Sequence, residues 1–455
     1  MRNKEKKIRN DKVGLGTLLI WCSRNISQTV FTLMYTFLMI YCTDTLKISP
    51  VIVSGILLGS KLVDGVTDML AEFIVDRTKT KWGKARPYEI FIVGYAACTA
   101  LLFSCPDSWS MTVKCVWVFL LYTMANAVCM TFLNANGTPY TVRAFKNEQI
   151  VKLTSYGSIF PMLTGFVFNI TFPMMMQKIA TSASGWSRLV LMWTVPALAI
   201  GLLRMIFIKE KYEVESKEMQ QEPLKLHHIV KLIKTNKYIL LLTLMTFIFN
   251  FVTNMGAVTY YYTYIVKNVG LMGVASAITI IALPLAFVFP KLISKFSTGK
   301  LMIAGLFVTS AGYLLNFFAG SNMPLLMIGQ LLTGAGTVPV TMLISLCIID
   351  CAEFNEWKGN HRMEGTMGSV IGLGGKIGAA VGGSILGVFL SLAGYTGVME
   401  TMPDSAFTMI RLLFSLIPMA LFLITAVSML GYLKMEKNMP EIKESNKEKR
   451  EQEGM

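Results

Sequence analysis

The chain has 455 residues, with 42 lysines and arginines against 27 aspartates and glutamates, which gives a formal net charge of +15. Charged residues make up 15% of the chain and hydrophobic residues 53%. Soluble domains contain about 25% charged residues, so this composition argues against a water-soluble enzyme. The apolar residues also occur in repeated blocks of about 18 or more, a length typical of membrane-spanning helices.

Twelve of these blocks are long enough to cross a hydrocarbon core of about 30 Å as helices. Helices are expected because lipid offers no hydrogen-bond partners to an unpaired backbone. The sequence therefore predicts an all-α membrane protein with twelve transmembrane helices, at residues 16–43, 49–74, 88–106, 112–136, 153–177, 187–208, 238–265, 272–292, 300–320, 323–349, 367–393 and 406–432.

Basic residues gather on one side of the predicted spans. Of the 42 lysines and arginines, 32 lie in the terminal segments and loops assigned to that side. Because an excess of Lys and Arg marks the cytoplasmic side, we expect a multi-pass protein of the cell membrane with both termini in the cytoplasm. The charge surplus is then an orientation signal, and a nucleic-acid partner is not expected.

The polar segment 209–237 divides the spans six and six. This layout predicts a first six-helix bundle at 1–208, a cytoplasmic linker at 209–237, a second six-helix bundle at 238–433 and a charged cytoplasmic tail at 434–455. Carriers with such pseudo-symmetric halves bind substrate near the midplane, at the interface of the halves. The sequence has no nucleotide-binding loop, which argues against ATP-driven pumping.

Asp64 and Asp68 are two carboxylates inside the second predicted span, and they share a helix face because they are four residues apart. A charge at the centre of a span costs about 2.5–3.5 kcal/mol, so each needs a partner or a function. Two like charges this close favour a cation between them. With the Thr67 hydroxyl they offer oxygen ligands for a hard cation. A structural network with Lys61 is the alternative.

Lys376 lies in a glycine-rich part of the eleventh predicted span, where glycines allow neighbouring helices to approach closely. A substrate or gating role and a structural ion pair both remain open for it. Arg204 is another basic residue inside a predicted span. Asparagine and arginine side chains offer donors and acceptors to a hydroxyl-rich ligand. Such groups within the predicted spans are Arg24, Asn25, Asn134, Asn250 and Asn254.

Three stretches together resemble one known family. The loop 76–87, DRTKTKWGKARP, resembles the loop after the second span of the glycoside–pentoside–hexuronide:cation symporters, the melibiose-carrier branch of the major facilitator superfamily. The stretch 61–68 is similar to that family's cation-site helix. Residues 350–357, followed by Arg362 to Gly365 and Lys376, are similar to its signature across the tenth and eleventh spans.

The resemblance implies the major facilitator fold and symport of a sugar or glycoside with a monovalent cation, Na⁺, H⁺ or Li⁺. It implies no other cofactor and no enzymatic activity, and we expect a monomer in the lipid bilayer. Two alternatives remain open. One is a cation-coupled carrier of lysolipids or other amphiphiles, and the other is a non-transporting membrane sensor.

The resemblance also assigns site residues, with departures in the sugar site. Where the melibiose branch has an Asp in the first span, this chain has Asn25, preceded by Arg24 in place of a Lys. The family's Asp in the fourth span corresponds to Asn134, and Thr131 matches a cation-ligand Thr. A shifted alignment of this stretch would bring in Thr138. The expected cation site is Asp64, Asp68, Thr67, Thr131 and Asn134, and the expected substrate site is Arg24, Asn25, Asn134, Thr138, Asn250, Asn254 and Lys376.

Charged residues near the cytoplasmic mouth are expected to pair and so to gate the carrier. Lys61 can neutralise one of the span-two carboxylates. The remaining residues of this set lie in loops of the two halves, where they would pair across the mouth, and solvated loops are the alternative. They are Asp76, Arg77 and Arg86 in the first half and Asp350, Glu353, Glu356 and Arg362 in the second.

Overall fold

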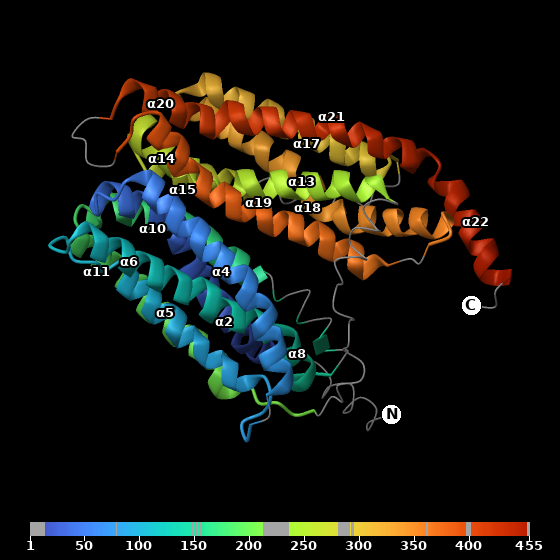
Figure 1. Ribbon diagram of the computed structural model, residues 1–455, viewed down its shortest axis with the longest axis horizontal. Helices are drawn as coiled ribbons and strands as arrows, with labels where there is room; N and C mark the ends of the chain where they lie inside the picture. The colour runs from blue at the N-terminus through green and yellow to red at the C-terminus, as the bar shows by residue number, and fades with distance from the viewer. Residues whose placement is uncertain are drawn as a thin grey trace. The chain divides into compact units, whose positions relative to one another are not determined.

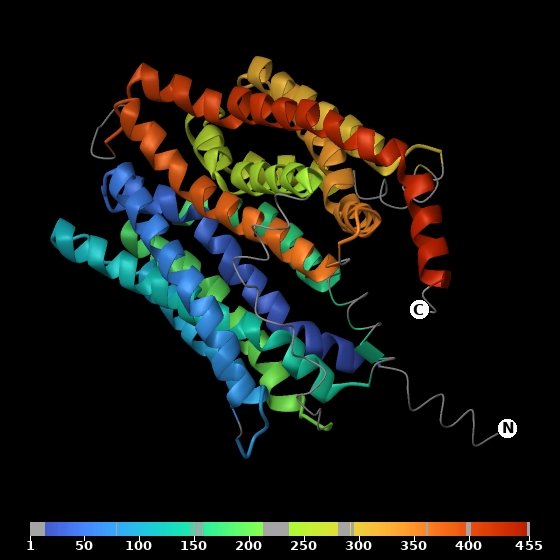
Figure 2. The same cartoon turned by 45° about the vertical axis from the view of Figure 1, so that its right-hand side comes forward.

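The computed structural model describes residues 14–78, 80–146, 149–150, 153, 157, 159–212, 236–280, 292, 295–360, 363–396 and 402–452. Within this part of the chain the regular structure is helical, and the only bridge between extended residues joins Thr80 and Gly83. Contacts between Cα atoms divide the chain into two compact units. Figures 1 and 2 show the helices of each unit running side by side.

Unit 1 holds the helices up to residue 207, and in it α2 packs against α11, α10 and α5, while α4 packs against α6 and α7. Its helices are α2 (Leu15–Met34), η1 (Tyr35–Phe37), α3 (Leu38–Ile40), η2 (Tyr41–Thr45), α4 (Pro50–Arg77), η3 (Arg86–Ile90), α5 (Phe91–Leu102), α6 (Met111–Thr123), η4 (Met124–Met130), α7 (Thr131–Ala135), α8 (Gly137–Ala144), α10 (Ile159–Ile179) and α11 (Ala183–Phe207).

Unit 2 is built on α13, which packs against α19 and α21, and on α17, which packs against α18 and α21. Its helices are α13 (Lys237–Asn254), α14 (Ala257–Tyr260), η6 (Tyr261–Ile265), α17 (Thr298–Ala319), α18 (Met323–Trp357), α19 (Glu364–Leu392), α20 (Asp404–Arg411), η7 (Leu412–Leu416), α21 (Ile417–Lys437) and α22 (Met439–Gln452). Helix α15 (Gly270–Ile280) follows η6 in the sequence.

Ten helical stretches of the described residues are long and apolar enough to cross a membrane: Leu15–Thr45, Pro50–Val75, Met111–Ala144, Ile159–Ile179, Ala183–Phe207, Lys237–Ile265, Thr298–Ala319, Met323–Trp357, Glu364–Leu392 and Asp404–Lys437. The predicted all-α membrane fold is therefore confirmed. Several of the stretches are continuous although a short 3-10 or π turn interrupts the α-helix, as at Met124–Met130.

Two of the twelve predicted spans are not among the ten. The predicted span 88–106 starts as the 3-10 helix η3 and continues as the short helix α5. Pro87 is compatible with the first turn of η3. Helix α5 ends at Leu102, shortly before Pro106, and the residue before a proline avoids helical geometry. The predicted span 272–292 coincides with α15 up to Ile280, and most of the rest lies outside the described residues.

Glycines bring α19 into backbone contact with α13. A Cβ atom at Gly378 would lie 2.2 Å from the carbonyl oxygen of Phe247, and one at Gly382 would lie 2.2 Å from that of Phe251. Gly374 makes a similar approach to Thr243. These glycines recur every four residues, so they line one face of α19. The glycine-rich sequence thus serves close helix packing, the usual role of small residues in membrane bundles.

We predict that Gly378→Ala destabilises the protein and that Gly372→Ala does not. A Cβ atom at Gly372 has no atom within 4 Å, whereas one at Gly378 forces the two helices apart. Such overpacking costs about 1–3 kcal/mol, while Ala in place of Gly favours a helix interior by about 1 kcal/mol. Thermal unfolding of both variants in the same detergent measures the difference. Equal melting temperatures would contradict the close approach of α13 and α19.

Candidate functional site

Asp64 and Asp68 of α4 meet Thr131, the first residue of α7. The Thr131 Oγ1 atom lies 3.1 Å from Asp64 Oδ1 and 3.1 Å from Asp68 Oδ1. A hydroxyl has one hydrogen to donate, so it cannot fully satisfy two carboxylates at once. The Lys61 Nζ atom lies 3.2 Å from Asp64 Oδ2 and neutralises one of the two charges. The cluster therefore has three oxygen-bearing side chains and a formal charge of −1.

The local backbone explains how Thr131 reaches the carboxylates. It follows the π turn η4, and its hydroxyl also lies 3.3 Å from the carbonyl oxygen of Asn126, five residues earlier. Single π turns of this kind are frequent at functional sites. The Thr67 hydroxyl instead donates to its own helix, with the carbonyl oxygens of Val63 and Asp64 both at 3.1 Å. The assignment of Thr67 as a cation ligand remains a prediction.

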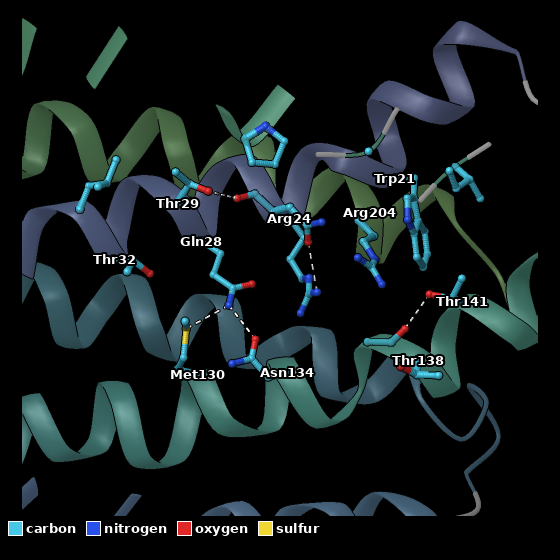
Figure 3. Close-up of a pocket in the computed structure, with 16 residues that line it drawn as sticks. Trp21, Arg24, Gln28, Thr29, Thr32, Met130, Asn134, Thr138, Thr141 and Arg204 are labelled. Atoms are coloured by element: carbon cyan, nitrogen blue, oxygen red, sulfur yellow. Dashed lines mark hydrogen bonds between the residues drawn. The ribbon is translucent and has the colours of Figure 1, made fainter. Parts of the chain in front are cut away.

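A cavity of about 690 Å³ lies within unit 1, between α2, α7, α8 and neighbouring helices. Arg24, Asn25, Asn134 and Thr138, four of the predicted substrate residues, line it (Figure 3). The other lining residues are Trp21, Gln28, Thr29, Thr32, Leu33, Met130, Gly137, Thr141, Leu153, Gly157, Pro161 and Arg204. One wall is rich in amides and hydroxyls, which can exchange hydrogen bonds with a hydroxyl-rich ligand.

Gln28 joins two of the helices that line the cavity. Its Nε2 atom donates to Asn134 Oδ1 at 2.9 Å and lies 3.0 Å from the Met130 sulfur. Gln28 belongs to α2 and Asn134 to α7, so this bond sets the separation of two elements that line the cavity (Figure 3). Among the described residues, Asn134 hydrogen-bonds with Gln28, and its assignments to the cation site and to the substrate site both remain predictions.

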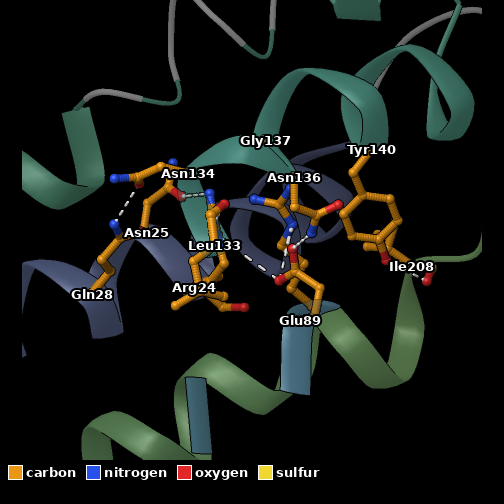
Figure 4. A network of polar contacts seen from close by, with 12 residues as sticks. Arg24, Asn25, Gln28, Glu89, Leu133, Asn134, Asn136, Gly137, Tyr140 and Ile208 are labelled. Atoms are coloured by element: carbon orange, nitrogen blue, oxygen red, sulfur yellow. Dashed lines mark hydrogen bonds and ion pairs between the residues drawn. The ribbon is translucent and has the colours of Figure 1, made fainter. Parts of the chain in front are cut away.

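Behind the cavity, the carboxylate of Glu89 lies between two arginines. Its Oε2 atom is 3.9 Å from Arg24 Nε and 3.6 Å from Arg204 Nε, and its Oε1 atom accepts a hydrogen bond of 2.8 Å from Asn136 Nδ2 (Figure 4). Glu89 and Arg204 are each 1% exposed and Arg24 is 6% exposed. The three side chains carry a formal charge of +1, buried where charge is expensive.

Aromatic rings hold the second arginine in place. The Arg204 guanidinium lies 3.4 Å from the centroid of the Trp21 ring and 4.9 Å from that of Tyr140. Such stacking compensates part of the cost of burying a cation. Tyr140 is fixed in turn, because its hydroxyl donates to the carbonyl oxygen of Ile208 at 2.8 Å. The Nη2 atom of Arg204 nevertheless has no hydrogen-bond partner among the described residues.

Sequence reasoning missed Glu89 and Gln28. Arg204 was noted as a charge inside a span but was not assigned to the site. A usable signal for Glu89 existed: it lies just inside the third predicted span, and two arginines in other predicted spans lacked an acidic partner. Gln28 gave no comparable signal, since a lone polar residue in a long span has many possible partners.

Three predicted substrate residues belong to unit 2. Asn250 Nδ2 donates to the carbonyl oxygen of Thr246, and Asn254 Nδ2 donates to that of Asn250, so both amides bond to their own helix. Lys376 is exposed on α19. The roles of these three in substrate binding remain predictions.

The end of α18 packs against α22, the helix formed by residues of the predicted tail (Figure 1). Lys443 pairs with Asp350 at 2.9 Å. Arg450 pairs with Glu353 at 3.1 Å and also with Glu356. The hydrogen bond to Glu356 raises the pKa of Arg450 above its ordinary value. These contacts stabilise α22 against α18, although partly exposed pairs contribute only about 0–1 kcal/mol each.

The predicted partners in the first half have other contacts. Arg86 donates from Nε to the carbonyl oxygen of Met205 at 2.9 Å, and the Arg77 guanidinium lies 3.8 Å from the centroid of the Phe73 ring. The Asp76 side chain and Arg362 lie outside the described residues. Pairing across the mouth of the carrier remains a prediction.

A family model described as MFS/sugar transport protein matches residues 20–433. The chain belongs to this family. It is a multi-pass membrane transporter of the major facilitator type and not an enzyme, as the sequence predicted. The resemblance to the glycoside–pentoside–hexuronide:cation symporters is likewise confirmed.

Several named proteins are similar to this chain over most of their length. The isoprimeverose transporter of Lactiplantibacillus pentosus is 26% identical over 93% of this chain and 89% of its own. The glucuronide carrier protein homolog of Escherichia coli (strain K12) is 25% identical over 90% of this chain and 91% of its own. Among solved structures, the nucleoside transporter NupG superposes with a TM-score of 0.64 at 14% identity, covering 91% of this chain and 99% of that one, which shows the shared fold.

We predict that Glu89→Gln strongly destabilises the protein and that a second substitution, Arg204→Gln, restores part of the loss. Removing the carboxylate leaves two buried guanidinium groups uncompensated, which costs about 3–5 kcal/mol. The double variant has the same net charge as the native cluster. Thermal unfolding in detergent measures both variants, with Glu441→Gln on the exposed face of α22 as the control. If Glu89→Gln melted like the control, Glu89 would not be the counter-ion of the arginines.

Proposed function

We propose that the protein is a cation-coupled symporter of a sugar or glycoside that works by alternating access. The observation that supports this proposal most strongly is the adjacency of two unlike sites in unit 1. A carboxylate cluster with a formal charge of −1 and an amide-rich cavity share the short helix α7, through Thr131 on one side and Asn134 on the other. The family and the named symporters among the relatives agree with it.

The coupling cation binds at Asp64, Asp68 and Thr131. Carboxylate and hydroxyl oxygens are ligands for hard cations, and Lys61 leaves one negative charge for a monovalent ion to neutralise. Na⁺, Li⁺ and H⁺ all fit this charge. An ion that relieves the repulsion between the two carboxylates also removes competition for the Thr131 hydroxyl, so binding orders the contact between α4 and α7.

The sugar binds in the cavity against Asn25, Gln28 and Asn134. Amide groups donate and accept hydrogen bonds, as do sugar hydroxyls, while Trp21 supplies an apolar ring at one end of the cavity. The cavity of about 690 Å³ is within the range of small-molecule sites, roughly 300–1,000 Å³.

The proposed function includes an orientation, an oligomeric state and an energy source for the carrier. The carrier lies in the cell membrane as a monomer with both termini in the cytoplasm, as the one-sided distribution of Lys and Arg suggests. It uses no cofactor other than the coupling ion. One cation moving down a potential of 100 mV supplies about 2.3 kcal/mol, and a chemical gradient of the ion adds to it.

We predict that Asp68→Asn and Asp64→Asn each abolish accumulation of substrate driven by a cation gradient. Either change neutralises the cluster, because Lys61 then balances the one remaining carboxylate. Uptake of labelled glycosides into right-side-out vesicles, under imposed Na⁺, Li⁺ and H⁺ gradients, measures accumulation. Asp107→Asn in an exposed loop of the same unit is the matched control and retains accumulation.

Exchange of labelled for unlabelled substrate at equal concentrations separates coupling from folding. A variant that is folded but uncoupled still exchanges, whereas an unfolded one does not. Concentration of substrate by Asp68→Asn against its gradient would refute the cation assignment. No accumulation of any tested glycoside by the native protein under any gradient would refute symport.

A further inference from the structure

A second cavity of unit 1 is apolar. It has a volume of about 540 Å³ and lies between α2, α10 and α11, which pack against one another. Its lining shares no residue with that of the amide-rich cavity. Among the described lining residues, one hydroxyl is present, that of Thr164, and it donates to the carbonyl oxygen of Phe160 in its own helix. The lining therefore suits an apolar chain rather than a sugar.

The cavity is a groove with a buried floor and an open rim. At the floor, Val30 and Ala197 are each 4% exposed. At the rim, Leu163, Val167 and Met192 are 50%, 51% and 54% exposed. All three helices belong to stretches that are long and apolar enough to cross a membrane, so the groove lies at membrane depth. An apolar groove that is open at this depth can take up a hydrocarbon chain.

The groove is long enough for a lipid chain. On α10 its lining extends from Phe160 to Met175, a rise of about 22 Å. One leaflet contributes about 15 Å of hydrocarbon, half of a core of about 30 Å. An acyl chain that enters at the Met175 end can therefore lie in the groove over the whole depth of its leaflet.

Two basic side chains lie at the Met175 end of the groove. Lys178 follows Met175 by three residues on α10, and Arg188 precedes Met192 by four residues on α11, so each shares a helix face with a lining residue. The turn 180–182 joins the two helices, which places both basic residues at the same end. Both side chains are exposed, and neither has an ion pair or a side-chain hydrogen bond among the described residues.

The charge at this end is one-sided. Residues 150–208, which include α10, the turn and α11, contain no aspartate or glutamate, and α2 contains none either. Lys178 and Arg188 lie at the ends of their predicted spans, so we expect them at the level of the lipid headgroups. They are two of the six basic residues that the sequence assigns to the side opposite the cytoplasm. A negatively charged headgroup would supply the counter-charge that these helices lack.

We propose that the groove between α2, α10 and α11 binds a phospholipid with an anionic headgroup, whose acyl chain lies in the groove and whose headgroup pairs with Lys178 and Arg188. The site is separate from the cation cluster and from the amide-rich cavity, so the lipid is a bound component of the carrier and not its substrate. One basic residue near the membrane surface favours an anionic lipid by about fivefold, and two favour it by about 25-fold.

Trp193 provides a probe inside the groove, which it lines while its ring packs on Phe168 with centroids 5.0 Å apart. The purified protein is reconstituted in phosphatidylcholine bilayers with increasing fractions of a lipid brominated on its acyl chains, either phosphatidylglycerol or phosphatidylcholine. Bromine quenches tryptophan fluorescence at short range, and Trp193→Phe gives the signal of the other tryptophans for subtraction. We expect the brominated phosphatidylglycerol to quench Trp193 at a mole fraction about 25-fold lower than the brominated phosphatidylcholine.

A pair of double variants tests the headgroup contact. Lys178→Gln with Arg188→Gln should remove the preference, so that both brominated lipids quench Trp193 at similar mole fractions. Both positions are exposed, so the fold should not depend on them. Lys47→Gln with Lys267→Gln is the matched control, because it removes two exposed basic residues that belong to other loops on the same predicted side. This control should keep the preference.

Loss of the preference in the groove variant alone would support the inference. Equal quenching by both lipids in the native protein would overturn it, as would a preference that survives in the groove variant. Equal losses in the groove variant and in the control would also overturn it, because the general surface charge would then explain the preference. Absence of Trp193 quenching by either lipid would mean that another part of the chain or a second copy covers the groove, and the inference would fail.

Discussion

Burial of charge in a medium that does not solvate it is the constraint on which this structure depends. Every ionised side chain inside a span needs a counter-charge or a ligand, because lipid does not solvate the charge as water would. Unit 1 contains two small clusters in which such charges pair. The negative cluster is Lys61, Asp64 and Asp68, and the positive cluster is Arg24, Glu89 and Arg204. The named side chains of the first cluster sum to a formal charge of −1, and those of the second sum to +1.

Helix α7 contacts both clusters, through Thr131 to Asp68 and through the Leu133 carbonyl oxygen to Arg24. It is five residues long and lies between the π turn η4 and helix α8 within the helical stretch Met111–Ala144. Thr131 at its start contacts the carboxylates, and Asn134 near its end contacts Gln28. In the proposed function, a cation at Asp64, Asp68 and Thr131 would couple to the cavity through this helix.

Much of this could be predicted from the sequence, for identifiable physical reasons. Apolar blocks of spanning length predicted the membrane helices correctly, because the bilayer acts on each span separately, whereas the orientation read from Lys and Arg stays a prediction. Asp64 and Asp68 were found because their spacing alone places them on one helix face. The glycines of α19 signalled close packing in the same way, although not that α13 was the partner.

What could not be predicted depends on contacts between distant parts of the chain. Glu89 lies in the 3-10 helix η3, and only the fold brings it between arginines from α2 and α11. Gln28 hydrogen-bonds with Asn134, more than one hundred residues later in the chain, and periodicity does not reveal such a contact. The sequence predicts a charged tail but not a packed helix. In the structure α22 packs against α18, where Lys443 pairs with Asp350 and Arg450 pairs with Glu353.

The central claim is that a cation at Asp64 and Asp68 and a sugar in the cavity bind cooperatively. Equilibrium titration of the purified protein tests it most directly, by measuring the Kd of the sugar with and without the cation and the Kd of the cation with and without the sugar. The account predicts that both constants fall by the same factor, and that Asp68→Asn abolishes the effect. A Kd for the sugar that does not depend on the cation would contradict it.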